Sequence, residues 1–169
     1  MNPLQKMRLM VARGIVKLVQ DSGLQLMQLD LLDEETRDGV ERVQNYGHRG
    51  HPPQGSTVAT VAVAGSRDHL VVVACEHPDH VPPLESGESA MYAMFGQLFK
   101  MDKEGNVTLT CKDFNIQASG NVTAAAAGNY TATAGGNLGI SASGGMSVNV
   151  AAWGMTGALA ASVLAKTVL

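Results

Sequence analysis

The residues best suited to metal chemistry are the five histidines, all of which lie in the first half of the chain. His48 and His51 form one His-x-x-His pair, and His77 and His80 form a second. Such spacing suits a transition metal only when further Cys or His ligands complete the site. Both pairs lie in Pro-rich segments without such ligands, so we interpret the histidines as solvated loop residues. We predict no metal site and no cofactor.

The carboxylates offer no clearer catalytic arrangement. Glu34 and Glu35 are adjacent, and Glu85 and Glu88 lie three apart, in polar segments typical of charged loops. No Ser-His-Asp triad or phosphate-binding loop has a supporting context in the sequence. The sequence therefore predicts a protein that is not an enzyme and that has no small-molecule substrate.

Cys75 and Cys111 are far apart and lie in strand-like runs. A disulfide framework normally contains more cysteines at closer spacing. We expect two buried, reduced thiols and synthesis in a cytoplasm.

Charge is distributed unevenly along the chain, whose formal net charge is -3. From Gly105 onward the charged residues are Lys112, Asp113 and Lys166. A broad basic face is therefore not expected, and we predict no nucleic-acid partner. The change in composition predicts a boundary between two architectures near residue 100.

The first half of the chain is typical of a small β-barrel. Residues 1–12 are interpreted as an N-terminal arm or short helix, and residues 13–102 as a barrel of the OB-fold type. Gln25, Met27, Leu29 and Leu31 share one face by alternation. The expected strands lie on both sides of a turn at 21–23, near 40–46, at 57–65, at 68–76 and, closing the barrel, at 89–102.

The second half contains an eight-residue repeat. The expected corners are glycines eight residues apart, most of them followed by Asn: Gly120, Asn121, Gly128, Asn129, Gly136, Asn137 and Gly144. A preceding unit at 105–111 is one residue short, which predicts a bend or bulge near Lys112. Repeats this short indicate stacked β-rungs.

Within each unit, small or apolar residues occupy every second position, so each unit predicts one short strand with one apolar face. The residues expected on this face are Phe114, Ile116, Ala118, Val122, Ala124, Ala126, Tyr130, Ala132, Ala134, Leu138, Ile140, Ala142, Met146, Val148 and Val150.

One thin apolar face stabilises a single chain too little to offset the entropy of ordering it. Three chains around a narrow axis would bury these faces against one another, which also explains the small side chains. We therefore predict that residues 103–150 form a homotrimeric intertwined β-helix or β-prism. A flexible linker and a monomeric β-solenoid are the alternatives, but linkers lack a strict phase and solenoids normally need larger core residues.

We expect residues 151–169 to form a short apolar tip, whose apolar run at 151–165 is shorter than the roughly 20 residues that a membrane-spanning helix needs. Two interpretations remain: a packed trimeric cap, and a surface presented to lipid. The residues assigned to this tip are Trp153, Met155, Leu159, Val163 and Leu164.

Several motifs occur together in this order: Tyr46-Gly47, Pro52-Pro53-Gln54-Gly55, Gly65-Ser66-Arg67 and the stretch Leu84–Tyr92. With the Gly-Asn repeat, they make the sequence similar to the central spike proteins of Mu-like contractile-tailed phages, the baseplate assembly protein V family. The resemblance implies a homotrimer at the tail tip of the virion, assembled in the host cytoplasm. It also implies docking on a trimeric baseplate hub and mechanical puncture of the host outer membrane.

The sequence departs from this family at one place. Many such spikes bind an iron ion through a C-terminal His-x-His motif, whereas no His follows His80 here, so we expect no iron at the apex. The alternatives are the tip of a related injection machine, pyocin-like or of type VI secretion, and a trimeric β-prism fibre or adhesin. An adhesin of that kind needs a secretory signal, and basic residues interrupt the apolar start of this chain.

Overall fold

The computed structural model describes residues 10–31 and 35–149. The apolar tip at 151–169, Val150 and most of the expected N-terminal arm therefore lie outside the described residues. The described chain is all-β, as predicted, with eight strands and two short 3-10 turns. It divides into two units, residues 1–116 and 117–169.

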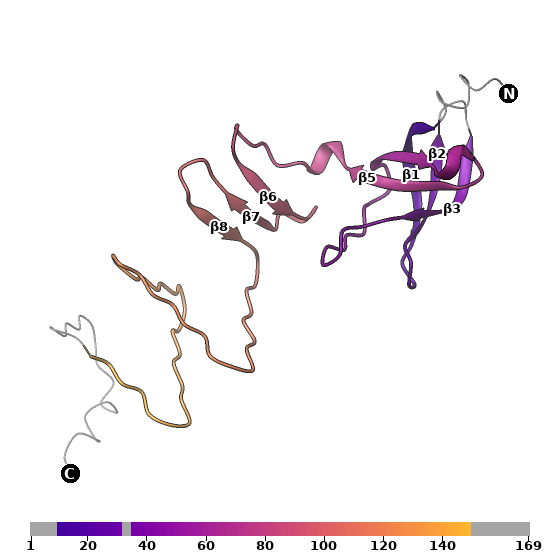
Figure 1. Cartoon of the computed structure of the whole chain (residues 1–169). Coiled ribbons are helices and arrows are strands. Elements are labelled where there is room, and N and C mark those ends of the chain that lie inside the picture. The colour runs from indigo at the N-terminus through magenta and orange to yellow at the C-terminus, as the bar shows by residue number, and fades with distance from the viewer. Residues whose placement is uncertain (1–9, 32–34, 150–169) are drawn as a thin grey trace, which may run out of the picture. The chain divides into compact units, whose positions relative to one another are not determined.

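The first five strands close into a barrel in the order β1-β2-β3-β5-β4 (Figure 1). All neighbouring pairs are antiparallel except β3 with β5. This is the five-stranded arrangement of an OB-fold, so the predicted barrel class is confirmed. The strands are β1 (Val11–Gln20), β2 (Leu26–Leu31), β3 (Thr36–Arg42), β4 (Thr57–Ala62) and β5 (Leu70–Glu76).

The barrel interior is filled by the alternating residues of these strands. Met27, Leu29 and Leu31 of β2 are buried on the face predicted from the sequence, while the intervening residues are half-buried. The other buried apolar residues are Val16, Val40, Val58, Ala62, Leu70 and Val72. The period-two pattern therefore located the core correctly.

Three strand boundaries differ from expectation. Strand β1 begins at Val11, inside the segment interpreted as an arm, and β3 ends at Arg42 although a strand was expected up to Tyr46. The β4–β5 connection is also longer than the expected Ser66-Arg67 junction, because the 3-10 turn η2 (Val63–Gly65) follows β4. Ala64 in this turn has a φ of 53°, the left-handed region that favours glycine.

The assignment of residues 89–102 to a closing strand of the barrel is wrong. These residues form β6 (Ser89–Tyr92) and β7 (Leu98–Met101), which join β8 (Val107–Thr110) in a separate three-stranded sheet. The barrel needs no further strand because β1 pairs directly with β4. Tight turns with positive φ at Gly96 and Gly105 connect each strand to its sequence neighbour.

Residues 111–149 contain bends but no strand, and every residue in this range is exposed. The bend expected near Lys112 is present at Lys112. Further bends lie at 119–120, 127–128, 135–136 and 143–144, at intervals of eight residues (Figure 1). Each coincides with a glycine that was assigned to a corner. Within the described ranges, no helix has the length and apolarity required to span a membrane.

Candidate functional site

The repeat segment carries an exposed apolar ladder, defined as Phe114, Val122, Tyr130, Leu138 and Met146. These residues lie eight apart, and each is 64% to 74% exposed. Ile116, Ile140 and Val148, two residues further along their units, are also exposed. Regularly repeated large apolar side chains in contact with water indicate a surface that another molecule covers.

The sheet β6–β8 has a similar unpartnered surface, which we call the sheet face. Cross-strand pairing aligns Met91, Phe99 and Leu109 in one row, and Met101 and Val107 in the next row on the same side. Phe99 is half-buried and the other four are exposed. The opposite side carries Lys100 and threonines, so the sheet has one apolar and one mixed face.

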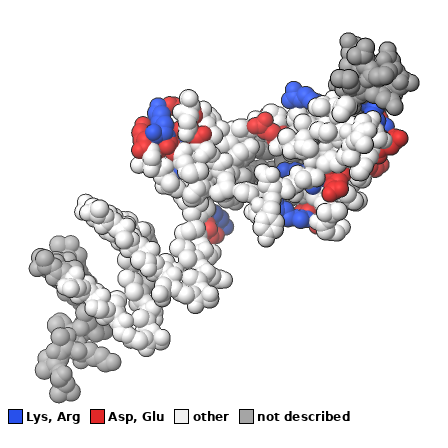
Figure 2. Space-filling model, viewed as in Figure 1, with Lys and Arg blue, Asp and Glu red and all other residues white. Residues whose placement is uncertain are grey.

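The repeat segment is also uncharged. Lys112 and Asp113 precede it, and residues 114–149 include no Asp, Glu, His, Lys or Arg. In Figure 2 this part of the chain is uniformly white, whereas red and blue side chains gather on the barrel and the small sheet. Ionic contacts can therefore form through residues of the first unit, while the described part of the second can offer only apolar and neutral polar contacts.

The histidines do not assemble a metal site. His48 and His51 are exposed, and His51 Nδ1 lies 3.7 Å from Asp21 Oδ2. His77 and His80 are half-buried rather than fully solvated, with ring centroids 4.3 Å apart. Among residues 10–31 and 35–149, no group of three His, Cys, Asp or Glu side chains has geometry suited to a metal ion.

The two cysteines differ from expectation and from each other. Cys75 is half-buried next to the barrel core, and burial raises the pKa of its thiol, which keeps it protonated and unreactive. Cys111 is exposed, so the prediction that both thiols are buried is wrong for this residue. It directly follows β8, at the start of the range 111–149 in which every residue is exposed.

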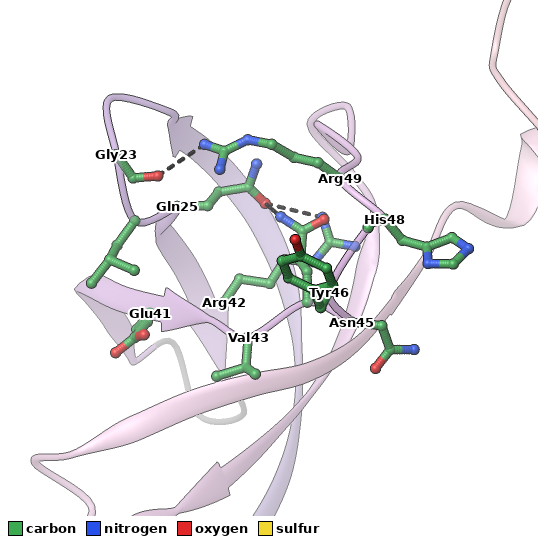
Figure 3. A pocket seen from close by; sticks show the side chains of 12 residues that line it. Gly23, Gln25, Glu41, Arg42, Val43, Asn45, Tyr46, His48 and Arg49 are labelled. Carbon is green, nitrogen blue, oxygen red and sulfur yellow. Dashed lines mark hydrogen bonds between the residues drawn. The ribbon is translucent and has the colours of Figure 1, made fainter.

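A polar network joins the β1–β2 turn to the loop that follows β3 (Figure 3). Gln25 is only 2% exposed, and its Oε1 accepts a hydrogen bond of 3.0 Å from Arg42 Nη1. Its Nε2 donates to the carbonyl of Gly50 at 3.1 Å, and Gln44 Oε1 accepts from the Gly50 amide at 2.8 Å. Arg49 adds a bond to the Gly23 carbonyl and an ion pair with Asp21. The loop is therefore fixed at several points.

This network was missed from the sequence, although a signal was present. Gln25 directly precedes β2 and continues the alternation of its apolar face, and a buried amide requires hydrogen-bond partners. The Arg49 hydrogen bond, supported by Gln25, lowers the pKa of Asp21. In the same loop, Tyr46 is fully exposed in a turn that is closed by a hydrogen bond from the His48 amide to the Asn45 carbonyl.

A second polar cluster lies where β3 begins. Glu35 accepts a hydrogen bond of 2.6 Å from Arg37 Nε and forms an ion pair with Arg67 of the β4–β5 connection. Arg37 also lies 3.6 Å from Asp68. Glu35 is thus a structural ion-pair partner, consistent with its interpretation as a non-catalytic charged residue; Glu34 lies outside the described residues.

The carboxylates after the barrel are tied into the small sheet. Glu88 Oε2 accepts hydrogen bonds from the Glu85 amide and from Lys100 Nζ, each 2.8 Å long. These bonds lower the pKa of Glu88, the backbone bond contributing most. Glu85 pairs with Lys103. Both carboxylates therefore serve the local fold of the segment 85–103.

The chain is similar to known phage proteins. The sequence model of the family described as "Bacteriophage Mu Gp45, N-terminal" matches residues 13–79, the range that holds most of the barrel. The "Baseplate puncturing device gp45" of Escherichia phage Mu is 34% identical over 122 residues, covering 71% of this chain and 62% of the relative. The "Mu-like prophage FluMu protein gp45" of Haemophilus influenzae is 38% identical over 118 residues, covering 68% of this chain and 64% of the relative.

The matches to both relatives are longer than the barrel, so the similarity continues beyond β5. The chain spans less than two thirds of the length of either relative. Neither of their names describes an enzyme. The barrel match and the two extended similarities agree with the resemblance found from the sequence motifs: residues 13–79 match the N-terminal family of phage Mu Gp45, and the chain is similar to Mu-like phage proteins over about 120 residues.

Proposed function

We propose that this protein is the central spike of a contractile phage tail. In this proposal it is a non-catalytic homotrimer at the baseplate tip of the virion, where its barrels dock on the trimeric hub. The repeat segment then forms a shaft that is driven through the host outer membrane. The name of the phage Mu relative, a baseplate puncturing device, supports the proposed location at the baseplate.

The observation that carries this proposal is the exposed apolar ladder. Phe114, Val122, Tyr130, Leu138 and Met146 recur every eight residues and are at least 64% exposed, and no strand is present among the described residues from 111 to 149. Three copies wound around one axis would bury the ladder of each chain against those of the others. Strands from neighbouring chains would also supply the missing backbone hydrogen-bond partners.

The sheet face supports the same arrangement closer to the barrel. Met91, Met101, Val107 and Leu109 leave one side of β6–β8 apolar and exposed. In a trimer, three such faces can turn toward the axis and continue the apolar interior of the shaft. The trimer contact would then begin near residue 89, before the repeat.

The mechanism is mechanical. The contracting sheath supplies the work, and the spike has to remain folded while it is loaded along its axis. Because each rung would be bonded to other chains on both sides, unfolding would require many contacts to break together. Slow unfolding of this kind is kinetic stability, and it needs no catalytic group, metal or cofactor.

A pair of neighbouring substitutions tests the trimer. Ala132 belongs to the face assigned to the axis, and Thr133 to the opposite face by strand alternation. We expect Ala132→Arg to prevent assembly because an unpaired charge would enter a narrow apolar axis, and Thr133→Arg to leave assembly intact. Sedimentation equilibrium of the full chain would give about three times its 17.7 kDa mass for the wild type and Thr133→Arg.

Two results would contradict the proposal. A wild-type chain that sediments as a monomer at micromolar concentration would exclude the trimeric shaft. Equal trimer yields from Ala132→Arg and Thr133→Arg would show that Ala132 does not face an axis. Detection of the chain in purified phage particles tests the virion location separately.

A further inference from the structure

A hollow of about 430 Å³ lies at one end of the barrel (Figure 3). We call it the Tyr46 pocket and define it by its lining, residues 23–25 of the β1–β2 turn and residues 41–49 at and after the end of β3. All of these residues belong to the barrel or to its own connections, so the pocket depends on no other part of the chain. Its volume falls within the range of roughly 300–1,000 Å³ that is typical of small-molecule sites.

The aromatic ring of this pocket lies on a turn with a defined backbone. Tyr46 is fully exposed, and a hydrogen bond of 2.9 Å from the His48 amide to the Asn45 carbonyl closes the turn that carries it. Gly47 has a φ of 83°, a conformation that glycine adopts at little cost. Further along the loop, Gly50 is held at both its amide and its carbonyl. The backbone that carries Tyr46 is therefore ordered before any ligand binds, which lowers the entropic cost of binding.

The arginines of the pocket are held by the barrel and can still bind a ligand. Arg42 donates to Gln25 through Nη1, and Arg49 donates to the Gly23 carbonyl through Nη2. A guanidinium carries N–H donors on three nitrogens, so each arginine is fixed at one nitrogen and can donate from the others. In Figure 3 the His48 side chain points away from this network. The pocket thus combines ordered cations with a neighbouring imidazole.

An exposed aromatic ring beside hydrogen-bond donors is suited to a saccharide. A pyranose ring presents C–H groups on its faces and hydroxyl groups at its edge. The negatively polarised face of the Tyr46 ring attracts the C–H groups, while Arg42 and Arg49 can donate to the hydroxyl oxygens. The turn between the first two strands and the face of the second and third strands are also the regions where OB-folds bind oligosaccharides and oligonucleotides.

The composition of the pocket favours a saccharide over single-stranded nucleic acid. Nucleic-acid sites of that kind combine a basic groove with several aromatic side chains on which bases stack. In the lining at 23–25 and 41–49, Tyr46 is the one Phe, Tyr or Trp residue. Glu41 in the lining and Asp21, which pairs with Arg49, offset the positive charge of Arg42 and Arg49. A phosphate backbone would therefore gain little from this site.

We propose that the Tyr46 pocket binds an N-acetylated oligosaccharide, as a ligand that the protein does not alter. Tyr46 would stack on one pyranose ring, and Arg42 and Arg49 would bind its hydroxyl oxygens. Leu24 and Val43 are exposed in the same lining and would contact the methyl group of an acetamido substituent, which a plain hexose lacks. This binding site is additional to the proposed spike function and involves the barrel alone.

Saturation-transfer difference NMR of the full-length protein with tri-N-acetylchitotriose tests the site, and maltotriose serves as the sugar without acetamido groups. The variants are Tyr46→Ala, Tyr46→Phe and Phe95→Ala. Phe95 is the matched control, because it is an exposed aromatic residue outside the lining of the Tyr46 pocket. Since both positions are exposed, circular dichroism should show that all three variants are folded.

We expect Tyr46→Ala to raise the dissociation constant for tri-N-acetylchitotriose at least about tenfold, because the stacking surface is lost. Tyr46→Phe keeps the ring face and should bind like the wild type, as should Phe95→Ala, while maltotriose should bind more weakly. Equal binding by the wild type and Tyr46→Ala would overturn the proposal, and so would the absence of saturation transfer from the wild-type protein. Equal binding of the two sugars would overturn the role of the acetamido group. Binding of single-stranded oligothymidylate without binding of the sugar would assign the pocket to nucleic acid instead.

Discussion

Gly14 shows how a single residue allows the barrel to close. It lies opposite Leu31 in the β1–β2 pairing, and the barrel wall passes very close to its Cα atom. A methyl group added there would lie 2.7 Å from Leu31 Cδ2 and 2.9 Å from the Asp30 carbonyl oxygen. The absence of a side chain at Gly14 is therefore a packing requirement and has no connection with turn geometry.

We expect Gly14→Ala to destabilise the barrel by about 1–3 kcal/mol, since Leu31 and the β2 backbone would have to move. Gly50→Ala is the matched control, because a methyl group at Gly50 meets nothing within 4 Å. Urea unfolding followed by circular dichroism would measure both variants. Equal urea midpoints for the two variants would show that Leu31 and the β2 backbone can move away from residue 14 without loss of stability.

Individual residues also show what could and could not be predicted from the sequence. Met27, Leu29 and Leu31 were assigned to the core correctly because burial follows strand alternation. Gln25 falls on the same face, but its partners are Arg42 at the end of β3 and Gly50 in the loop that follows. Alternation identifies which side of a strand is buried, whereas a hydrogen-bond network depends on which loop lies over that side.

Among the elements, the sheet β6–β8 differs most from what the sequence predicts. Residues 89–102 were expected as one strand, although Gly96 has a φ of 86° and closes a hairpin between β6 and β7. Short apolar runs show that a strand forms but do not specify its partner. The pairing is decided here by local turns, at Gly96 and Gly105, which bring neighbouring strands together at little entropic cost.

The hydrogen bonds of Glu88 make this segment sensitive to acid. Because its pKa is lowered in the folded protein, the carboxylate stabilises the fold above the unfolded pKa of about 4, and this contribution is lost as the pH falls through the folded-state pKa. We expect amide hydrogen exchange at 85–101 to accelerate, relative to its intrinsic rate, as the pH falls from about 5 to 3.

Glu88→Gln should remove most of this pH dependence, while Glu104→Gln, in the exposed turn before β8, should retain it. Hydrogen exchange with mass spectrometry resolves the segment from the barrel. If Glu88→Gln shows the same acid response as the wild type, then other carboxylates, such as Asp102, hold the segment together.

At the scale of the whole molecule, the two units differ in how many of their residues are buried within one chain. The barrel has its own buried core, whereas the described repeat leaves every residue exposed. The eight-residue repeat could be recognised in the sequence because its corner and face residues recur at a fixed spacing along the chain. The three-chain shaft depends on contacts between chains, so within a single chain it stays a prediction.

A chain that ends at Lys112 should therefore fold and remain monomeric. We expect it to show β-sheet circular dichroism and one cooperative thermal transition, because the buried apolar residues of the described chain all lie within β1–β5. It should lack the SDS resistance expected of the full-length trimer. A stable trimer of the shortened chain would place the main contacts between copies in the barrel or on the sheet face.

The uncharged composition of residues 114–149 has a consequence for how the protein responds to its medium. Without Asp, Glu, His, Lys or Arg, this stretch binds and releases no protons across the range where carboxylates and imidazoles ionise, and it has no ion pair for salt to screen. Protonation and the screening of ion pairs therefore act on the charged residues outside 114–149. Contacts made by residues 114–149 respond instead to heat and to solutes that weaken or strengthen apolar association.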